Sequence, residues 1–290
     1  MNYTLINQKF VTKKNAVISI EQRACRFGDG IFETCKIIDG IIYDYESHEA
    51  RIFKGLKALQ ISATIKNLKN NSYHLIKKNQ IKNGILRISI SRGAGSLGYL
   101  PAKKIEPLII IETREERKID KKIIIGISKI KAPKRSLNLQ NCKTMQSLNY
   151  VLAKINAEKS NHFDDVMLSE NGHIAECSSA NIFWVKNGKI FTSSTKCDTL
   201  LGTTRQKILQ KFPLKINLVE AKLSRLYNAD EIFLTNASFL VLAVDEIVIN
   251  GKKNKLQKNL STKVLQCLKL DIKKYNIRNN SIQNLTSKKI

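Results

Sequence analysis

The sequence is short of acidic residues. Only 24 of its 290 residues are Asp or Glu, against 50 Lys or Arg, which gives a formal charge of +26. The lysines are spread along the whole chain, and no basic run alternates with aromatic residues, as stacking on nucleic-acid bases requires. We therefore interpret most of the charge as a solvated surface that helps to attract anionic substrates, and we expect no nucleic-acid partner. A basic nucleic-acid-binding protein is kept as a minor alternative.

Clustered cysteines and long apolar runs are also missing. The six cysteines show neither a CxxC spacing nor a dense framework, which argues against a metal site and against a disulfide scaffold. This pattern favours a reduced, cytoplasmic setting. The longest apolar run, 239–244, is too short to cross a bilayer, and the first residues have no secretory signal. We expect no metal ion and no membrane partner.

The apolar pattern indicates a mixture of strands and helices. Residues 3–20 are expected to form two short strands about a turn at 13–15, and 31–45 a hairpin across Asp39-Gly40. Ser47 is expected to cap the next helix. The polar stretch 115–140 is the predicted connection between domains. We therefore divide the chain into an N-terminal domain 1–120, a connection 121–140 and a C-terminal domain 141–290.

A lysine, a carboxylate and a helix start follow one another between residues 143 and 205. Lys143 precedes a segment, 148–158, whose apolar residues recur at helical spacing. A nucleophilic lysine must lose its proton near neutral pH, which needs apolar surroundings or a nearby cation. Cys142, Met145 and Leu148 offer such surroundings. Taken alone, however, a lysine in so basic a chain is far more often a surface residue.

Glu176 lies in a predicted antiparallel meander and is followed by small residues, 177–180, that leave room for a flat ring. A carboxylate there can keep a pyridine nitrogen protonated, although an exposed strand glutamate is the simpler interpretation of this residue alone. Gly202, Thr203 and Thr204 open a helix, whose N–H groups and dipole favour an anion. Alone this is an N-cap. In this order, the three parts indicate a site for pyridoxal 5'-phosphate.

Several segments resemble the fold-type IV pyridoxal-phosphate enzymes, the family of branched-chain and D-amino-acid transaminases and aminodeoxychorismate lyase. They are KTMQSLNYVLAK, ECSSANIFWVKNGKIFT, LLGTTR, RFGDGIFETCKIIDG and HEAR. The resemblance implies an α+β fold with a small N-terminal α/β domain, a larger C-terminal β-rich domain and the cofactor between them. It also implies a homodimer that acts on a small, anionic, amino-acid-like substrate.

The same resemblance implies the site residues. Lys143 would be the catalytic lysine that holds the cofactor covalently, Glu176 the partner of the pyridine nitrogen, and His48 a structural residue. The cofactor-binding residues would be Arg51, Lys143, Glu176, Leu200, Thr203, Thr204, Ala237 and Ser238. The family's threonine pair is missing at 235–238, which weakens the expected side-chain contact there. The substrate-binding candidates are Phe32, Thr34, Arg87, Arg92 and Tyr99. Arg92 is the first candidate for a substrate carboxylate and Arg87 the second, with a surface arginine as the alternative for Arg92.

The activity divides into two possibilities. ISRGAGSLGY, ECSSANIFW and LTNAS resemble lyase forms of the family, and residues 93–101 lack the Arg-x-His of D-amino-acid transaminases. We therefore expect conversion of 4-amino-4-deoxychorismate to 4-aminobenzoate and pyruvate, a step of folate biosynthesis. The alternative is an aminotransferase that acts on branched-chain or D-amino acids with 2-oxoglutarate, because FGDGIFETCK is equally typical of transaminases.

Overall fold

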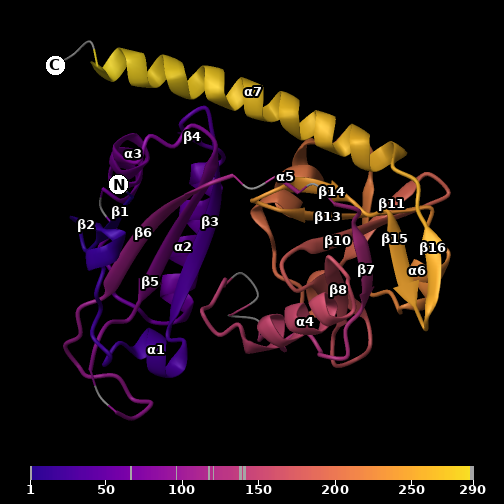
Figure 1. The fold of residues 1–290 in the computed structure, drawn as a ribbon, viewed down its shortest axis with the longest axis horizontal. Helices are drawn as coiled ribbons and strands as arrows, with labels where there is room; N and C mark the ends of the chain where they lie inside the picture. The colour runs from indigo at the N-terminus through magenta and orange to yellow at the C-terminus, as the bar shows by residue number, and fades with distance from the viewer. Residues whose placement is uncertain are drawn as a thin grey trace. The chain divides into compact units, whose positions relative to one another are not determined.

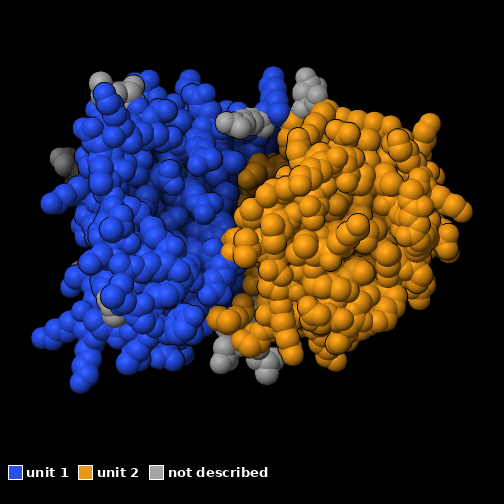
Figure 2. Space-filling view, turned by 60° about the horizontal axis from the view of Figure 1, so that its bottom comes forward, with its two compact units in different colours: residues 1–118, 141–146, 272–290 blue, residues 119–140, 147–271 orange. Residues whose placement is uncertain are grey.

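The chain forms two compact units, each with its own sheets and helices (Figure 1). The computed structural model describes residues 2–65, 67–95, 97–116, 118–119, 121–136, 139 and 142–287, with side chains described to residue 279. Unit 1 contains Met1–Lys118, Asn141–Gln146 and Ile272–Ile290, and unit 2 contains Ile119–Gln140 and Ser147–Asp271 (Figure 2). Residues 141–146 and 272–290, which we placed in the C-terminal domain, thus cluster with unit 1. The expected α+β class is confirmed.

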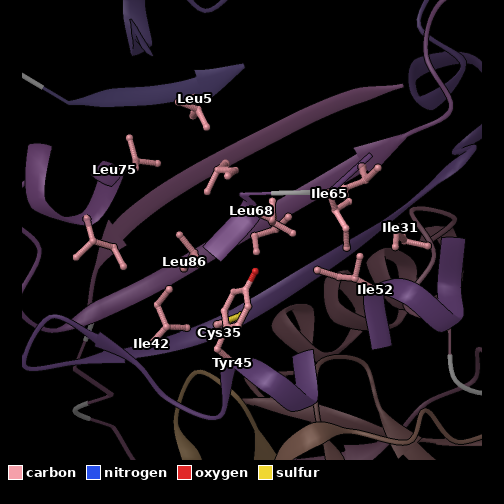
Figure 3. Packing of buried hydrophobic residues seen from close by; sticks show 14 of the residues in the cluster. Leu5, Ile31, Cys35, Ile42, Tyr45, Ile52, Ile65, Leu68, Leu75 and Leu86 are labelled. Atoms are coloured by element: carbon pink, nitrogen blue, oxygen red, sulfur yellow. The ribbon is translucent and has the colours of Figure 1, made fainter. Parts of the chain in front are cut away.

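Unit 1 is built on a six-stranded antiparallel sheet with the order β2-β1-β6-β5-β3-β4. Its elements are β1 (Tyr3–Ile6), β2 (Lys9–Thr12), η1 (Lys13–Asn15), α1 (Arg23–Phe27), β3 (Gly30–Ile38), β4 (Ile41–Ile42), α2 (Tyr45–Ala58), α3 (Leu68–Lys78), β5 (Gly84–Ser91) and β6 (Leu108–Glu115). Aliphatic side chains of the sheet pack against those of α2 and α3 to form the core of this unit (Figure 3).

Strand β3 alternates between this core and the opposite face of the sheet. Ile31, Glu33 and Cys35 are buried, whereas Phe32 and Thr34 are half-buried. The same alternation places Leu86, Ile88 and Ile90 of β5 in the core and leaves Ile85, Arg87 and Ser89 half-buried. A strand with one covered face and one more open face can carry functional side chains without disturbing the core.

The expected hairpin is confirmed, with Asp39 and Gly40 at φ 53° and 77° between β3 and β4. Two local predictions were wrong. The first two strands turn at Asn7-Gln8 instead of 13–15, because the backbone and side chain of Asn7 pair with Ile109 of β6. Helix α2 starts at Tyr45, after Asp44, because the Asp44 carbonyl accepts the N–H of Ser47, which was expected to be the cap.

Unit 2 contains two five-stranded sheets, β12-β11-β10-β13-β14 and β16-β15-β7-β8-β9. Its elements are β7 (Ile124–Ile127), α4 (Leu148–Lys159), β8 (Asp164–Leu168), β9 (Ile174–Cys177), β10 (Asn181–Lys186), β11 (Lys189–Ser193), η2 (Thr195–Cys197), α5 (Thr203–Lys211), β12 (Ile216–Val219), α6 (Ser224–Tyr227), β13 (Glu231–Asn236), β14 (Leu240–Ala243), β15 (Glu246–Ile249) and β16 (Lys252–Lys255). The expected antiparallel meander is instead two antiparallel hairpins, β8–β9 in one sheet and β10–β11 in the other. Helix α7 (Asn259–Ser287) has residues in both units.

The helix expected after Lys143 is α4, but its apolar stripe is not its buried face. Leu148, Val151, Leu152 and Ile155 are all exposed, and Leu148 retains 69% of its accessible surface. The helix packs through small residues, Ala153 and Ala157, which let its backbone approach β8 and β9. Leu148 therefore does not supply the apolar surroundings that we expected near Lys143.

All six cysteines lie in the described part of the chain, and none forms a disulfide. Cys35, Cys142, Cys177 and Cys197 are buried, whereas Cys25 is exposed. Burial raises the pKa of the Cys35 and Cys177 thiols well above the usual range. Among the described residues, no helix is both long and apolar enough to cross a membrane.

Candidate functional site

In unit 1, Lys143 is held beside the start of β3. Its carbonyl accepts the N–H of Phe32 at 2.9 Å, and two residues further on the N–H of Met145 donates to the Gly30 carbonyl at 2.9 Å. A Cβ at Gly30 would lie 2.8 Å from the Met145 sulfur and 2.6 Å from the Ile90 carbonyl, so only glycine permits this close pairing. The backbone of Lys143 is thereby fixed by a strand.

Two cationic side chains contact the ring of Phe32. The Lys143 Nζ lies 4.5 Å from the ring centroid, and the Arg87 guanidinium carbon lies 4.1 Å from it. Arg87 is directly opposite Thr34 in the β3–β5 register. Burial lowers the pKa of Arg87, and the nearby Glu112 charge offsets part of this decrease. The structure thus brings together four of the expected residues on the more open face of this sheet.

Arg51 is tied to Glu33, a residue that the sequence interpretation did not single out. The Arg51 Nε and Nη2 donate to the two oxygens of Glu33 at 2.6 and 2.8 Å, and His48 Nδ1 lies 2.7 Å from Glu33 Oε2. Burial alone raises the pKa of Glu33, but Arg51 and His48 together lower it to about 2. Glu33 is therefore an anion that orients Arg51, and His48 helps to hold it, as its expected structural role requires.

Arg92 is engaged by the protein itself. Its Nε and Nη2 donate to Asp29 at 2.7 and 3.1 Å, and Nη1 and Nη2 donate to the carbonyls of Gln60 and Leu59 at 2.8 and 2.6 Å. Arg23 completes this group: it donates to Asp29 at 2.8 Å and to the carbonyls of Gly98 and Tyr99 at 2.9 and 2.6 Å.

Arg23 contacts both ends of the segment 93–99, because its backbone N–H also donates to the Gly93 carbonyl at 2.9 Å. Ser96 of this segment lies outside the described residues. Tyr99 contributes its carbonyl to this group, whereas its side chain is 87% exposed and packs against Phe27. Arg92 and Tyr99 stay predictions as substrate ligands. The contacts of Arg92 make it a weaker candidate than Arg87.

In unit 2, Glu176 is a buried carboxylate whose two oxygens have different partners. Oε2 accepts the N–H of Leu200 at 2.9 Å and the Asn181 amide at 3.2 Å, with the Thr199 hydroxyl at 3.5 Å. Oε1 accepts the Tyr150 hydroxyl at 2.8 Å. This is not the exposed strand glutamate of the simpler interpretation, because only 4% of Glu176 is accessible.

Arg135 and Tyr150 complete this network and were not identified from the sequence. Arg135 Nη2 donates to the Tyr150 hydroxyl at 2.7 Å and lies 3.6 Å from Glu176 Oε1. Burial and the Glu176 charge raise the pKa of Tyr150, so it stays a hydrogen-bond donor. Burial alone lowers the pKa of Arg135, but Glu176 and Tyr150 raise it above its ordinary value. Nothing in the spacing distinguishes this arginine from the many surface cations.

Helix α5 begins where the sequence indicated an anion site. Gly202 is its N-cap, and the side chains of Thr203 and Thr204 are buried in the first turn. A Cβ at Gly202 would lie 2.2 Å from Asn181 Oδ1, so the helix start and the Glu176 network need glycine at this position. Arg205 is 1% exposed and donates to the Ser193 carbonyl at 2.8 Å, and burial lowers its pKa to about 10.

The turn after β13 is organised by a side chain. Asn236 Oδ1 accepts the N–H groups of Ser238 and Phe239 at 2.9 and 3.0 Å, and Ala237 lies between Asn236 and Ser238 in the turn. The hydroxyl of Thr235 is buried and has no hydrogen-bond partner among the described residues. A hydroxyl left in that state is expected to find a partner when a ligand binds.

These groups fit pyridoxal phosphate. The buried Glu176 carboxylate suits a protonated pyridine nitrogen, the start of α5 suits a phosphate, and Lys143 offers an amine for covalent attachment. No group of three or more His, Cys, Asp or Glu side chains that could hold a metal ion occurs in the described ranges.

Comparison with known proteins gives a consistent result. Residues 30–247 match the family model described as amino-transferase class IV. The chain is 30% identical over 259 residues to a putative branched-chain-amino-acid aminotransferase of Methanocaldococcus jannaschii, covering 86% of this chain and 90% of that protein. It is 27% identical to a D-alanine aminotransferase of Bacillus licheniformis, covering 89% and 94%.

Among solved structures, the 4-amino-4-deoxychorismate lyase of Pseudomonas aeruginosa has the same fold. The TM-score is 0.80 at 20% identity, and the match covers 93% of this chain and 99% of that one.

Proposed function

Because the chain belongs to the class IV aminotransferase family and is a pyridoxal-phosphate-dependent enzyme, we propose that it converts 4-amino-4-deoxychorismate to 4-aminobenzoate and pyruvate. The residues that carry this proposal are Lys143, Arg51, Glu176, Thr203 and Thr204. The structural observation behind an anionic substrate is the pair formed by Arg87 and Lys143 on the Phe32 ring.

When bound, pyridoxal phosphate supplies an electron sink for a carbanion next to the substrate nitrogen. Lys143 Nζ accepts the proton from the carbon that carries the substrate amine. Glu176 keeps the proton on the pyridine nitrogen, and Arg135 and Tyr150 keep Glu176 ionised and oriented. Arg51, fixed by Glu33, and the N–H groups and hydroxyls at the start of α5 bind the phosphate.

In a lyase, the substrate then loses its enolpyruvyl group as pyruvate, and the ring becomes aromatic. Arg87 binds a substrate carboxylate while Phe32 and Thr34 line the same face of the sheet. The choice of the lyase rests on the segments ISRGAGSLGY, ECSSANIFW and LTNAS. The name and fold of the Pseudomonas aeruginosa lyase are consistent with it.

An aminotransferase is the second candidate, and a specific observation favours it. The relatives from Methanocaldococcus jannaschii and Bacillus licheniformis are named as aminotransferases for branched-chain amino acids and D-alanine. In that reaction Lys143 accepts the same proton, and the amino group passes to a keto acid such as 2-oxoglutarate. We also propose a homodimer, which light scattering of the purified protein can measure.

One assay separates the two candidates. The purified protein, loaded with the cofactor, is incubated with 4-amino-4-deoxychorismate, and in parallel with branched-chain and D-amino acids plus 2-oxoglutarate. We expect equal amounts of 4-aminobenzoate and pyruvate from the first mixture. Glutamate formed in the second mixture, with no 4-aminobenzoate in the first, replaces the lyase with the aminotransferase.

Borohydride reduction and peptide mapping test the attachment site. The expected label is on Lys143 of the unaltered protein and is lost in Lys143→Arg. A label on another lysine contradicts the assignment. Lys154 is the reference lysine, at which no label is expected, because it lies on α4 and its amine donates to the Phe163 carbonyl.

A further inference from the structure

The two oxygens of Glu176 differ in how many hydrogen bonds the protein gives them. Oε2 has the Leu200 N–H and the Asn181 amide, with a longer contact to Thr199. Oε1 has the hydroxyl of Tyr150 as its hydrogen-bond donor among the described residues. A carboxylate oxygen can accept two hydrogen bonds, so Oε1 keeps the capacity for one more.

Tyr150 also separates Glu176 from Arg135. The guanidinium Nη2 is 2.7 Å from the tyrosine oxygen and 3.6 Å from Glu176 Oε1, so it hydrogen-bonds to the tyrosine and forms a longer ion pair with the carboxylate. The hydroxyl therefore accepts from the cation and donates to the anion. In such a relay the charge of the arginine polarises the hydroxyl, while the arginine itself stays at ion-pair distance from the carboxylate oxygen.

Other contacts keep Arg135 and Tyr150 where they are. The Arg135 N–H donates to Asp198 at 3.0 Å, next to the segment that binds Glu176 Oε2. On α4, Asn149 donates to the Lys131 carbonyl at 3.0 Å, which ties the helix to the segment before Arg135. The relay is thus supported from both sides.

We infer that Tyr150 is a positioning residue that holds Arg135 at ion-pair distance from Glu176 and so keeps Oε1 available to the protonated ring nitrogen of the cofactor. This inference rests on the proposed cofactor role of Glu176. Without the hydroxyl, Arg135 has room to move closer than 3.6 Å and to donate a hydrogen bond to Oε1. Glu176 then holds the ring proton less well, although the carboxylate, its charge and the fold are unchanged.

The test measures the proton itself. Pyridoxal phosphate labelled with ¹⁵N in the ring is bound to the unaltered protein, to Tyr150→Phe and to Glu176→Gln, and the ¹⁵N resonance is followed between pH 6 and 9. The unaltered protein is expected to show a protonated nitrogen throughout. Glu176→Gln should show an unprotonated nitrogen, and Tyr150→Phe should lose the proton within this range of pH. Tyr227→Phe, which removes a hydroxyl bonded to Asn250 elsewhere in unit 2, is the control and should match the unaltered protein.

Activity gives a second readout. Losing a hydrogen bond to a charged group is expected to lower kcat by about tenfold in Tyr150→Phe, with KM nearly unchanged. A nitrogen that stays protonated in Tyr150→Phe, while Glu176→Gln loses the proton, overturns this inference and leaves the proposed function intact. A nitrogen that Glu176→Gln does not affect, or a protein that does not bind the cofactor, overturns the proposed role of Glu176 and this inference with it.

Discussion

Arg87 lies in the middle of β5 and Arg92 directly follows its last residue, and the two have different surroundings. Arg92 donates four hydrogen bonds to Asp29, Leu59 and Gln60, whereas Arg87 rests on the Phe32 ring. We expect Arg87→Lys to lower kcat/KM for the anionic substrate by about tenfold to a hundredfold, the scale of a charged hydrogen bond. Steady-state kinetics at several substrate concentrations measure this change.

Arg92→Lys is the matched variant. It should leave kcat/KM close to that of the unaltered protein and should lower the free energy of unfolding instead, because lysine cannot replace a guanidinium that joins Asp29 to two carbonyls. Urea unfolding measures this second effect. The assignment is reversed if Arg92→Lys loses kcat/KM while Arg87→Lys does not.

The lowered pKa of Glu33 determines the direction in which the stability of the folded protein changes with pH. The ordinary value is 4.5, and Arg51 and His48 lower it to about 2 against the effect of burial. A depressed pKa stabilises the folded state above pH 4.5, and this contribution is lost as the pH falls toward 2. Its size is on the order of 3 kcal/mol, at about 1.4 kcal/mol for each pKa unit.

The measurement is urea unfolding of the protein and of Glu33→Gln between pH 7 and pH 2. The unaltered protein should lose stability more steeply below pH 4.5 than the variant does. Glu116→Gln is the control, because Glu116 pairs with Lys36 at a site where its side chain is 43% exposed. Parallel pH curves for the protein and Glu33→Gln would contradict the assignment.

At the scale of single residues, the sequence predicted those candidate site residues that lie within a recognisable local segment. Glu176 and the start of α5 lie within short segments whose order and small neighbours indicated a cofactor. Glu33, Asp29 and Tyr150 were not predicted, because each acts through partners 15 to 63 residues away. With 50 basic residues, the chain does not reveal which arginine is buried beside a carboxylate.

Among the elements, the start of α5 tolerates little change. A methyl group at Gly202 would meet Asn181 Oδ1 at 2.2 Å, and Asn181 donates to Glu176 and to the Leu200 carbonyl. Gly202→Ala is therefore expected to displace Asn181 and to lower stability by about 1 to 3 kcal/mol, as overpacking does. It should also weaken binding of pyridoxal phosphate, which absorbance titration measures.

Gly98→Ala is the control for this substitution, because a Cβ there meets no atom within 4 Å. It should change neither stability nor cofactor affinity. Normal cofactor affinity in Gly202→Ala would mean that the helix start and the Glu176 network are independent of each other.

Helix α4 shows what periodicity can and cannot predict. The spacing of its apolar residues predicted a helix correctly, since that spacing fits one helical face. It did not predict which face is buried. Ala153 and Ala157 pack inward because small side chains allow close contact with β8 and β9, and small residues contribute little to an apolar pattern.

For the whole molecule, the strands and helices followed from apolar periodicity and turn residues, and the α+β class from the resemblance to the fold-type IV enzymes. The clustering of residues 141–146 with unit 1 did not follow from these patterns. It depends on backbone pairing of Lys143 and Met145 with β3, more than 100 residues earlier in the chain, and a backbone hydrogen bond leaves no trace in side-chain pattern.

The net charge of +26 also acts on the whole molecule. If it draws anionic substrates to the protein, kcat/KM should fall as salt rises from about 0.01 M to about 0.1 M, over which the screening length shortens from about 30 Å to about 10 Å. The value of kcat at saturating substrate should stay constant and serves as the control. A kcat/KM that does not depend on salt would leave Arg87 as the main source of attraction.

The rate at which an alkylating reagent modifies the buried thiols reports local opening of the strands that carry them. Cys35 lies in β3 of unit 1, and Cys177 follows Glu176 in β9 of unit 2, so an alkylating reagent reaches each one only when its own strand opens. Exposed Cys25 should react at once and set the scale of intrinsic reactivity. Mass spectrometry of the labelled peptides then gives a separate opening rate for each unit. Addition of pyridoxal phosphate should slow the labelling of Cys177, and an unchanged rate would show that cofactor binding does not hold this strand closed.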